Sequence, residues 1–421
     1  MRKNLLRLLA AALAGALLSA ALFGCAPAGD TQSLPQLSAA PAKPSAGPEQ
    51  TAPPQPKTPQ QTELSQAVAG RLAGMTLREK VGQMFFVRPD ALDPAQEQQQ
   101  IDDADADGVT ALTDAMSAVL ADYPVGGVVL FGKNITGPQQ LTDLTGQLHA
   151  AMDTPLLIAV DEEGGAVARL ANHPAFDLPR YESAAAVAAA GGAQAVRQMY
   201  AEIGGYLDSY GIDLDFAPDA DVNTNPDNPV IGTRAFSSDP QTAAELVAAA
   251  VEGFADTGVL CCVKHYPGHG DTAEDSHKSL AAIHKTWAEL AACELLPFQA
   301  GVRAGADLVM AGHIAAPEVT GEDTPASLSP QLMGSIRTGL GFSGAIVTDS
   351  LAMEGITGLY SAGEAAVLAV QAGADILLMP NGLAEAFDAV VAAVEEGAIP
   401  ESRIDESAAR VLALKEKRGL I

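Results

Sequence analysis

Eight short apolar runs, each bounded by Gly, Pro or Asp, constrain the fold of this 421-residue chain more than any other feature. The runs are continuous rather than alternating, which is typical of strands buried on both faces in a parallel sheet covered by helices. The eight expected strands are Val81 to Val87, Gly126 to Phe131, Pro155 to Val160, Gly211 to Phe216, Gly258 to Val263, Asp307 to Ala311, Gly344 to Thr348 and Asp375 to Met379.

Ala-rich amphipathic stretches separate most of these runs and predict helices, as at Pro240 to Thr257, Lys285 to Ala304 and Ser361 to Ala372. Strands alternating with helices over this length predict an α/β (β/α)8 barrel of the TIM type as a single catalytic domain, with a doubly wound open sheet as the alternative. The phrase Ala-Gly-Ala-Asp precedes two of the strands, and we expect its Gly to end a helix each time.

Titratable side chains follow five of the expected strands. In a barrel the carboxyl ends of all strands meet at one mouth, so these groups would converge there. A single strand-end Asp is often only a helix cap, but five such ends favour an active site. The residues are Asp161, Asp219 and Asp221, Lys264 and His265, His313, and Asp349.

The first 62 residues are typical of an export and anchoring region. Arg2, Lys3 and Arg7 precede an apolar run that ends at Gly24-Cys25, as in a secretory signal peptide. Leu22 to Cys25 also resembles a bacterial lipobox, so we expect a signal over residues 1–25 with lipidation at Cys25. Residues 26–62 are rich in Pro, Ala, Gln and Ser and predict a disordered tether before a folded domain at 63–421. The expected location is outside the cytoplasm of a bacterium, lipid-anchored to its cell membrane.

The formal charge is −28, and it becomes −31 without the three cations of the signal region. A chain this acidic is not expected to bind nucleic acid, or anionic membranes by charge, so the lipid anchor would be its only membrane contact. Cys261, Cys262 and Cys293 show no metal-ligand spacing, and we expect buried thiols rather than a disulfide.

The segment from Lys264 to His277 holds three His, two Asp and a Lys directly after an apolar run. Its end, Asp275-Ser276-His277, places a carboxylate two residues from an imidazole, so both side chains point the same way in an extended segment. An Asp-oriented His is a general acid/base unit.

Four motifs in order resemble glycoside hydrolase family 3, in its β-N-acetylglucosaminidase (β-N-acetylhexosaminidase) subgroup. The resemblance covers the folded part from about residue 63 to the C-terminus. The motifs are Asp161 to Gly165, Asn228 to Phe236, Lys264 to Thr272 with Asp275 to His277, and Ile346 to Met353.

The resemblance implies that Asp349 is the nucleophile, that His277 is the acid/base, and that Asp275 orients His277. Other family members take the acid/base from a Glu in an added C-terminal domain, which we do not expect here. The resemblance implies no cofactor and no metal. It places Asp161, Arg169, Arg234, Lys264 and His265 on the sugar, where Asp161 accepts hydrogen bonds and the others donate; Arg234 could instead be a salt-bridged structural residue at the barrel rim.

The expected function is therefore that of a retaining exo-β-N-acetylhexosaminidase, acting as a monomer on terminal N-acetylglucosamine of peptidoglycan fragments or chitin-like oligosaccharides. Two features depart from the family pattern. Ala166 stands where the family usually carries Arg, and residues 88–122 form a longer segment than expected, with an acidic cluster at Asp102 to Asp107. That cluster resembles a calcium loop in composition alone.

Other functions remain open from sequence. One is a phosphorylase or another β-glycosidase on the same fold. A second is a metal-dependent hydrolase, with ligands drawn from His265, His269, Asp271 and His277. A third is a surface-tethered glycan-binding lipoprotein without catalysis, for which the altered residue Ala166 is the one argument.

Overall fold

A computed structural model of the chain describes residues 64–273 and 280–421. The expected signal, lipidation site and tether lie outside these residues, as do Asp275 and His277. Their predictions therefore stay predictions.

Eight parallel strands form one sheet with the order β11-β9-β7-β6-β3-β2-β1-β12. The two ends of this order meet through a parallel bridge between Val347 and Ile376, which closes the sheet into a barrel. The predicted barrel is confirmed, and the open sheet is not. The strands are β1 Phe85–Val87, β2 Gly127–Val129, β3 Leu157–Val160, β6 Leu214–Asp215, β7 Leu260–Tyr266, β9 Leu308–Ala311, β11 Ala345–Thr348 and β12 Leu377–Leu378.

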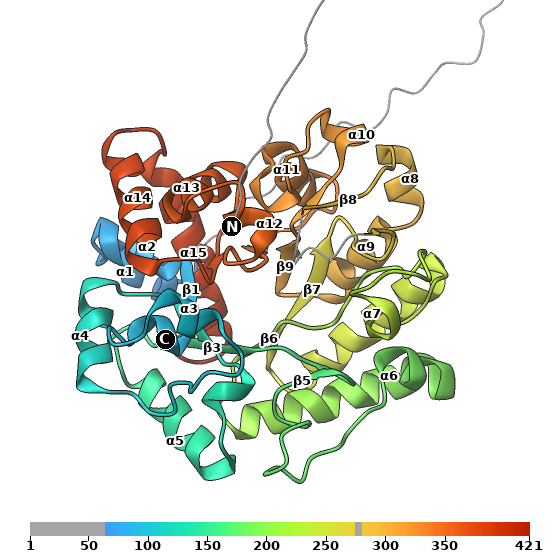
Figure 1. Ribbon diagram of the computed structural model, residues 1–421, viewed down its shortest axis with the longest axis horizontal. Helices are drawn as coiled ribbons and strands as arrows, with labels where there is room; N and C mark the ends of the chain where they lie inside the picture. Colours follow the sequence, from blue (N-terminus) through green and yellow to red (C-terminus); the bar gives the residue numbers. More distant parts are fainter. Residues whose placement is uncertain (1–63, 274–279) are drawn as a thin grey trace, which may run out of the picture. The chain divides into compact units, whose positions relative to one another are not determined.

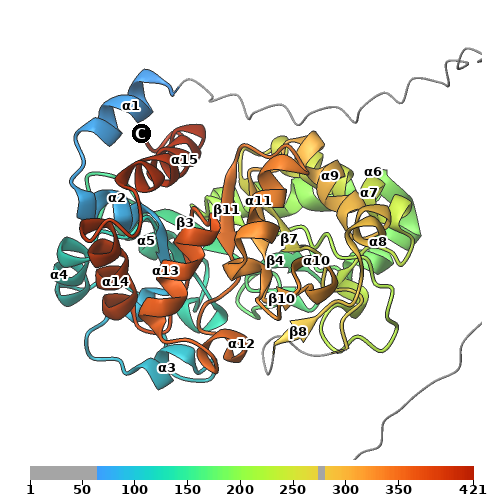
Figure 2. The same ribbon diagram turned by 90° about the horizontal axis from the view of Figure 1, so that it is seen from above.

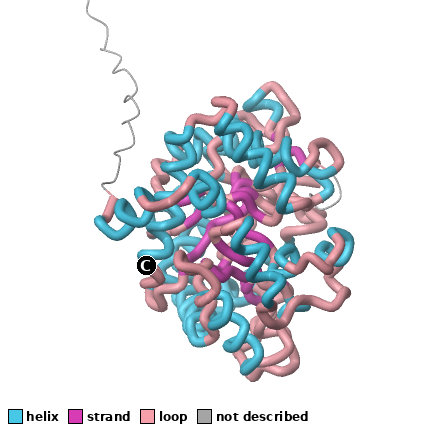
Figure 3. The backbone as a smooth tube through the Cα atoms, turned by 90° about the vertical axis from the view of Figure 1, so that its left-hand side faces the viewer, coloured by secondary structure: helices cyan, strands magenta, loops and turns pink. Residues whose placement is uncertain are grey.

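Helices surround the strands on the outside of the barrel (Figures 1 and 3). Most begin at a Ser, Thr or Asp cap, as where the Asp239 side chain accepts from the Thr242 amide at the start of α7. The α-helices are α1 Gln66–Ala73, α2 Leu77–Gln83, α3 Gln98–Asp102, α4 Asp114–Asp122, α5 Pro138–His149, α6 Ala184–Ser209, α7 Pro240–Ala255, α8 Trp287–Ala292, α9 Leu295–Ala304, α10 Pro317–Thr320, α11 Pro330–Thr338, α12 Glu354–Thr357, α13 Ala362–Ala372, α14 Leu383–Glu395 and α15 Glu401–Lys417. The short 3-10 helices of the described residues are η1 Pro89–Leu92, η2 Gly132–Asn134, η3 Gly232–Arg234 and η4 Ala326–Leu328.

The two ends of the barrel carry different elements. In Figure 2, α1 and α15 lie at one end, and α3 and α12 lie at the other, together with the parallel pair of β8 Ala281–Ala282 with β10 Ile314–Ala315. A second small pair, the hairpin of β4 Glu162–Gly164 with β5 Val167–Ala168, directly follows β3. These additions lie beyond the carboxyl ends of the barrel strands.

Alternate residues of the barrel strands face a packed interior, and the others pack against the helices. The adjacent thiols show this alternation, because Cys262 belongs to the interior cluster and Cys261 to the layer beneath the helices. Burial raises the pKa of both thiols. Both are buried free thiols, as predicted, whereas the free thiol of Cys293 is only partly buried.

Three element boundaries differ from the sequence expectation. Val81 to Gln83 belong to α2, so the first strand begins only at Phe85. The helix expected over 285–304 is two helices, because Cys293 has φ −132° and ψ −83° and ends α8. Strand β7 continues to Tyr266, so Lys264 and His265 lie within the strand and not after it.

Both Ala-Gly-Ala-Asp phrases end a helix, as expected. Gly305 and Gly373 have φ of +104° and +121° and donate their N–H groups to the last helical carbonyls. The Asp that follows each Gly accepts a hydrogen bond from a neighbouring strand, Asp307 from the Cys261 amide and Asp375 from the Ile346 amide. The repeated phrase thus fixes the amino ends of two strands.

Among the helices of residues 64–273 and 280–421, we found none with the length and apolar character that a membrane crossing requires.

Candidate active site

The carboxyl ends of β3, β6, β7 and β11 bring most of the predicted site residues to one mouth of the barrel. Asp161 follows β3, Asp219 and Asp221 lie beyond β6, and Asp349 follows β11. A parallel bridge between Asp219 and Lys264 ties the second of these ends to β7.

Lys264 is the buried cation at the centre of the site. Its Nζ lies 2.8 Å from Asp161 Oδ1 and 2.7 Å from Glu163 Oε1. Burial would lower the pKa of Lys264, but the two carboxylates raise it above its usual value. Lys264 therefore stays charged and fixes the direction of the half-buried Asp161 carboxylate.

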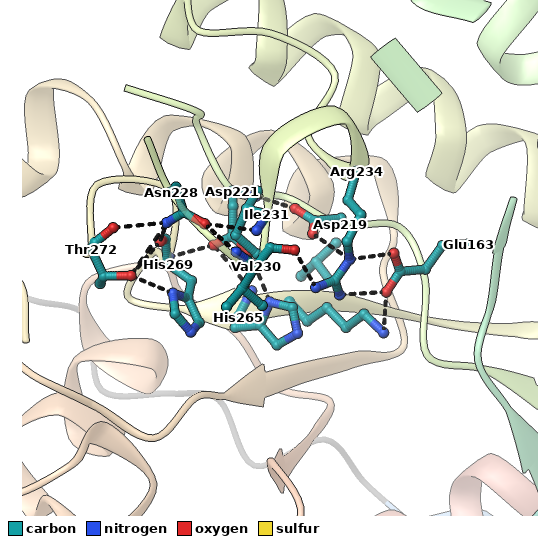
Figure 4. Close-up of polar contacts among 12 residues, drawn as sticks. Glu163, Asp219, Asp221, Asn228, Val230, Ile231, Arg234, His265, His269 and Thr272 are labelled. Carbon is teal, nitrogen blue, oxygen red and sulfur yellow. Dashed lines mark hydrogen bonds and ion pairs between the residues drawn. The ribbon is translucent and has the colours of Figure 1, made fainter. Parts of the chain in front are cut away.

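Glu163 joins Lys264 to Arg234. The Arg234 guanidinium donates from Nε to Glu163 Oε2 at 2.8 Å and from Nη2 to Oε1 at 2.7 Å (Figure 4). Burial would raise the pKa of Glu163, but Arg234 and Lys264 hold it well below its usual range. This bidentate pair agrees with the alternative in which Arg234 is a salt-bridged structural residue. A contact from Arg234 to sugar stays a prediction.

Asp221 organises the end of β7. Its Oδ2 lies 2.8 Å from His265 Nδ1, and its Oδ1 accepts from the His269 amide at 2.6 Å. Burial and the nearby Arg234 lower the pKa of His265 to about 4, so the ring is neutral at pH 7. With Nδ1 donating to Asp221, the neutral ring presents Nε2 as an acceptor. Donation from His265 to a sugar, as the resemblance implies, would need a second ring proton.

Asp219 and Asp221 form a buried carboxylate pair. The Asp221 amide donates to Asp219 Oδ1 at 2.9 Å, and Asp219 Oδ2 lies 3.6 Å from Arg234 Nε. Burial raises the pKa of Asp221 to about 7, and burial together with the Asp221 charge raises that of Asp219. The pair therefore retains a proton near neutral pH.

The same two carboxylates and the His265 ring offer ligand atoms within 4.8 Å of one another, a spacing that suits a metal ion. Arg234 already supplies positive charge at 3.6 Å from Asp219, which opposes cation binding there. Of the ligands considered from sequence, His277 lies outside the described residues, and among the other three only His265 belongs to this group. Asp271 instead binds the Thr224 hydroxyl at 2.6 Å and lies 3.2 Å from Lys285.

Asn228 holds the loop after β7 in place. Its Nδ2 donates to the carbonyls of His269 at 2.8 Å and Thr272 at 3.0 Å, while its Oδ1 accepts from the Val230 and Ile231 amides (Figure 4). The His269 ring lies 2.6 Å from the Thr272 hydroxyl. These contacts fix the backbone up to Thr272, immediately before the segment that contains Asp275 and His277.

Asp349 lies half-buried at the carboxyl end of β11. Its amide donates to the Ala311 carbonyl at 2.9 Å, and its Oδ1 accepts from the Ser350 amide at 2.7 Å. The Asp349 charge acts on the pKa of both His265 and His269, opposing the lowering by burial. The carboxylate therefore lies near enough to both rings for its charge to act on them.

His313, beyond β9, contacts Ser350, the residue next to Asp349. Its Nε2 lies 2.8 Å from the Ser350 carbonyl and its Nδ1 lies 2.7 Å from the Ser327 hydroxyl. A carbonyl only accepts, so Nε2 carries the ring proton and Nδ1 accepts from Ser327. His313 thereby fixes the residue next to Asp349.

Arg169 lies at the edge of the site. Its Nη2 is 3.6 Å from Asp161 Oδ2, and its backbone amide donates to the buried Glu162 carboxylate. Ala166, where the family resemblance leads one to expect Arg, is exposed in the turn between β4 and β5. The structure thus brings Arg169 close to Asp161 although position 166 carries Ala and not Arg.

Sequence reasoning placed Asp219, Asp221 and His313 at the mouth of the barrel without an individual role, and it assigned no role to Glu163 or Asn228. Each had a signal, because Glu163 and Asn228 lie within the quoted motifs and the other three follow strands. Their roles depend on which partner each one meets, and that is set by the folded barrel.

Comparison with known proteins agrees with this geometry. Residues 76–414 match the model of the glycosyl hydrolase family 3 N terminal domain. The chain is 40% identical over 277 residues to a β-hexosaminidase of Stenotrophomonas maltophilia, covering 63% of this chain and 80% of that protein. It is 34% identical over 335 residues to β-hexosaminidase A of Pseudoalteromonas piscicida, covering 73% of this chain but 56% of that longer protein.

Among solved structures, the family 3 β-N-acetylglucosaminidase of Paenibacillus sp. str. FPU-7 superposes with a TM-score of 0.73 and 38% identity. The match covers 82% of this chain and 63% of that one. The family match, these relatives and the barrel lead to one conclusion: the chain belongs to glycoside hydrolase family 3.

Proposed function

We propose that this protein is a retaining exo-β-N-acetylhexosaminidase. It would release terminal β-linked N-acetylglucosamine from peptidoglycan fragments or chitin-like oligosaccharides. The observation that carries the proposal is the position of Asp349 at the carboxyl end of β11, at the same mouth of the barrel where Lys264 fixes Asp161. A nucleophilic carboxylate next to fixed acceptors and donors suits a sugar whose hydroxyls must be held during reaction.

In the first step, an Asp349 oxygen would form a bond to the anomeric carbon as the bond to the leaving oxygen breaks. His277, oriented by Asp275, would give its proton to that oxygen. In the second step, His277 would take a proton from water, whose oxygen bonds to the anomeric carbon and releases Asp349. Retention of the β-configuration follows from the two displacements.

The geometry supports a proposed role for each sugar contact. Asp161 would accept hydrogen bonds from sugar hydroxyls while Lys264 holds its carboxylate, and the neutral His265 ring would accept a hydrogen bond from a further hydroxyl through Nε2. Arg169 would donate from the edge of the site. Arg234 would hold Glu163 and, through it, Lys264.

The test is turnover of 4-nitrophenyl β-N-acetylglucosaminide by the full chain, purified in detergent. Asp349→Asn and His277→Ala should each lower kcat by about 10³-fold or more, because each removes a group acting on the bonds that change. Asp323→Asn, which alters an exposed Asp in another loop, is the matched control and should retain activity.

Three further arms separate the alternatives. Activity lost with a chelator and restored by a divalent ion would favour a metal-dependent hydrolase. A sugar phosphate formed only with added phosphate would identify a phosphorylase. Saturable binding of N-acetylglucosamine without turnover of this or the matching glucoside would identify a glycan-binding protein.

We also propose that Cys25 anchors the protein to the outer side of a bacterial cell membrane. The supporting features are the basic start, the apolar run and the Leu22-Phe23-Gly24-Cys25 sequence. Cells given an alkyne fatty acid should label the wild-type protein and not Cys25→Ser. Unlabelled wild-type protein released into the medium would contradict the anchor.

A further inference from the structure

The segment that follows β1, residues 88–113, is fixed onto the loop after β2. This segment is shorter than the 88–122 segment expected from sequence, because residues 114–122 form α4, the helix between the first two barrel strands. Asn134 Nδ2 donates to Asp90 Oδ2 at 2.8 Å and to the Val109 carbonyl at 3.0 Å. Asp90 in turn accepts from the Val109 amide at 3.0 Å. Both ends of the segment are thus held by one buried network.

Lys133 fixes the middle of the same segment. Its Nζ donates to the carbonyls of Gln100 at 2.8 Å, Ile101 at 2.9 Å and Asp103 at 3.1 Å. These carbonyls end α3 and would otherwise lack helical partners. Three donors on three acceptors hold α3 at the end of the barrel that carries α12, β8 and β10 (Figure 2).

Phe131 connects this segment to the sugar-binding edge. The Arg88 guanidinium carbon lies 4.8 Å from the centroid of the Phe131 ring, and the Arg169 guanidinium carbon lies 5.4 Å from the same centroid. Both distances suit cation–π contacts. The three residues follow β1, β2 and the hairpin after β3, which are neighbours in the barrel.

Each of the two guanidinium groups also lies near a carboxylate. Arg88 Nη1 donates to Asp102 Oδ1 at 2.7 Å and to the Ile101 carbonyl at 2.8 Å, so Arg88 is tied to α3. Arg169 lies 3.6 Å from Asp161, and its buried Nε has no hydrogen-bond partner in the described part of the chain. The Phe131 ring is therefore a main constraint on where the Arg169 guanidinium lies.

We propose that Phe131 is a positioning residue for Arg169, and that the segment 88–113 acts on the sugar-binding edge through the contact of Arg88 with Phe131. The inference rests on the proposed function, in which Arg169 and Asp161 bind the sugar. It gives the segment a role in substrate affinity rather than in metal binding, since Asp102 is committed to Arg88 and to Gln98.

The test compares Phe131→Leu with Phe131→Tyr, which keeps the ring, in the full chain. Phe131→Leu should raise KM for the aryl glycoside by about fivefold and leave kcat within about twofold, since the contact orients a binding group. Phe131→Tyr should keep the wild-type KM, and Arg88→Met should raise KM as Phe131→Leu does. Phe342→Leu is the matched control, because that ring contacts Arg337 at 5.6 Å before β11, at the other end of the barrel.

Two measurements separate positioning from a general structural effect. If Phe131 acts through Arg169, then Phe131→Leu adds nothing to the KM of Arg169→Ala, whereas independent effects would multiply. A crystal structure of Phe131→Leu should show Arg169 displaced from Asp161. Arg169 unmoved, or effects that multiply, would overturn the proposal. The crystal structure decides even if wild-type protein fails to turn over, which would instead refute the proposed function.

Discussion

Glu163 and the Asp219–Asp221 pair show how single residues set the charge of the site. Glu163 stays ionised against full burial because Arg234 and Lys264 both contact it, whereas the two Asp residues lack such close cations and retain a proton. Removing one partner of a buried pair leaves an uncompensated charge. The positions of these carboxylates near strand ends could be predicted from sequence, but their protonation could not. Protonation depends on distances of a few ångströms to side chains that are distant in the sequence.

The raised pKa of Asp219 predicts a specific dependence of stability on pH. Between about pH 4, where Asp ionises in the unfolded chain, and neutral pH, the folded protein binds a proton that the unfolded chain has lost. Stability therefore falls as pH rises through this window, and Asp219→Asn should lack this component. Denaturant unfolding at pH 5 and pH 8 should show the variant gaining stability relative to wild type at the higher pH. An unchanged difference between the two pH values would contradict the raised pKa.

At the scale of elements, the strands were predictable because the barrel strands are mostly apolar, and each of the eight expected runs contains all or part of a barrel strand. The additions at the carboxyl end were not. The hairpin β4–β5 and the pair β8–β10 are short, and their pairing depends on segments brought together by the barrel. Strand β7 also extends through Lys264 and His265, which polar composition had excluded from the expected strand.

The loop after β7 is closely packed against the segment after β6. A Cβ on Gly270 would lie 2.0 Å from the Val222 carbonyl oxygen, which is backbone and cannot rotate away. Gly270→Ala should therefore displace the loop, lower the free energy of unfolding by about 1–3 kcal/mol and reduce kcat/KM. Gly132→Ala, where a Cβ would meet nothing within 4 Å, is the matched control. Wild-type stability and activity in Gly270→Ala would show that the loop is not packed as described.

At the scale of the whole molecule, the C-terminal helix closes the amino end of the barrel. Val411 and Leu414 of α15 belong to the interior cluster, and Arg410 and Arg403 contact the buried Asp375 at the start of the last strand. Such a closure could not be read from sequence, because α15 has the pattern of any amphipathic helix. Its role is stability, since the site lies at the opposite end.

Lys415 of α15 is fully buried, with the Gln83 side chain as its hydrogen-bond partner. Burial lowers its pKa to about 7. Between pH 7 and about pH 10.5 the unfolded chain holds a proton that the folded protein lacks, so wild-type stability rises with pH across this window. Lys415→Met should lack that rise, and its stability relative to wild type should be highest below pH 7.

Thermal unfolding of both proteins from pH 6 to pH 10 measures this difference. Leu412→Met, a buried change on the same helix without an ionisable group, is the control and should follow the wild-type pH dependence. A Lys415→Met curve parallel to wild type would mean that Lys415 stays protonated within the fold.

The most direct test of the central claim is to trap the glycosyl intermediate on Asp349. Wild-type protein treated with a 5-fluoro N-acetylglucosaminyl fluoride, a slow substrate whose intermediate accumulates, is digested and its peptides are weighed by mass spectrometry. We predict one added sugar on the peptide containing Asp349 and none in Asp349→Asn. A sugar on another carboxylate, or turnover with inversion and no labelled peptide, would contradict the assignment of Asp349 as the nucleophile.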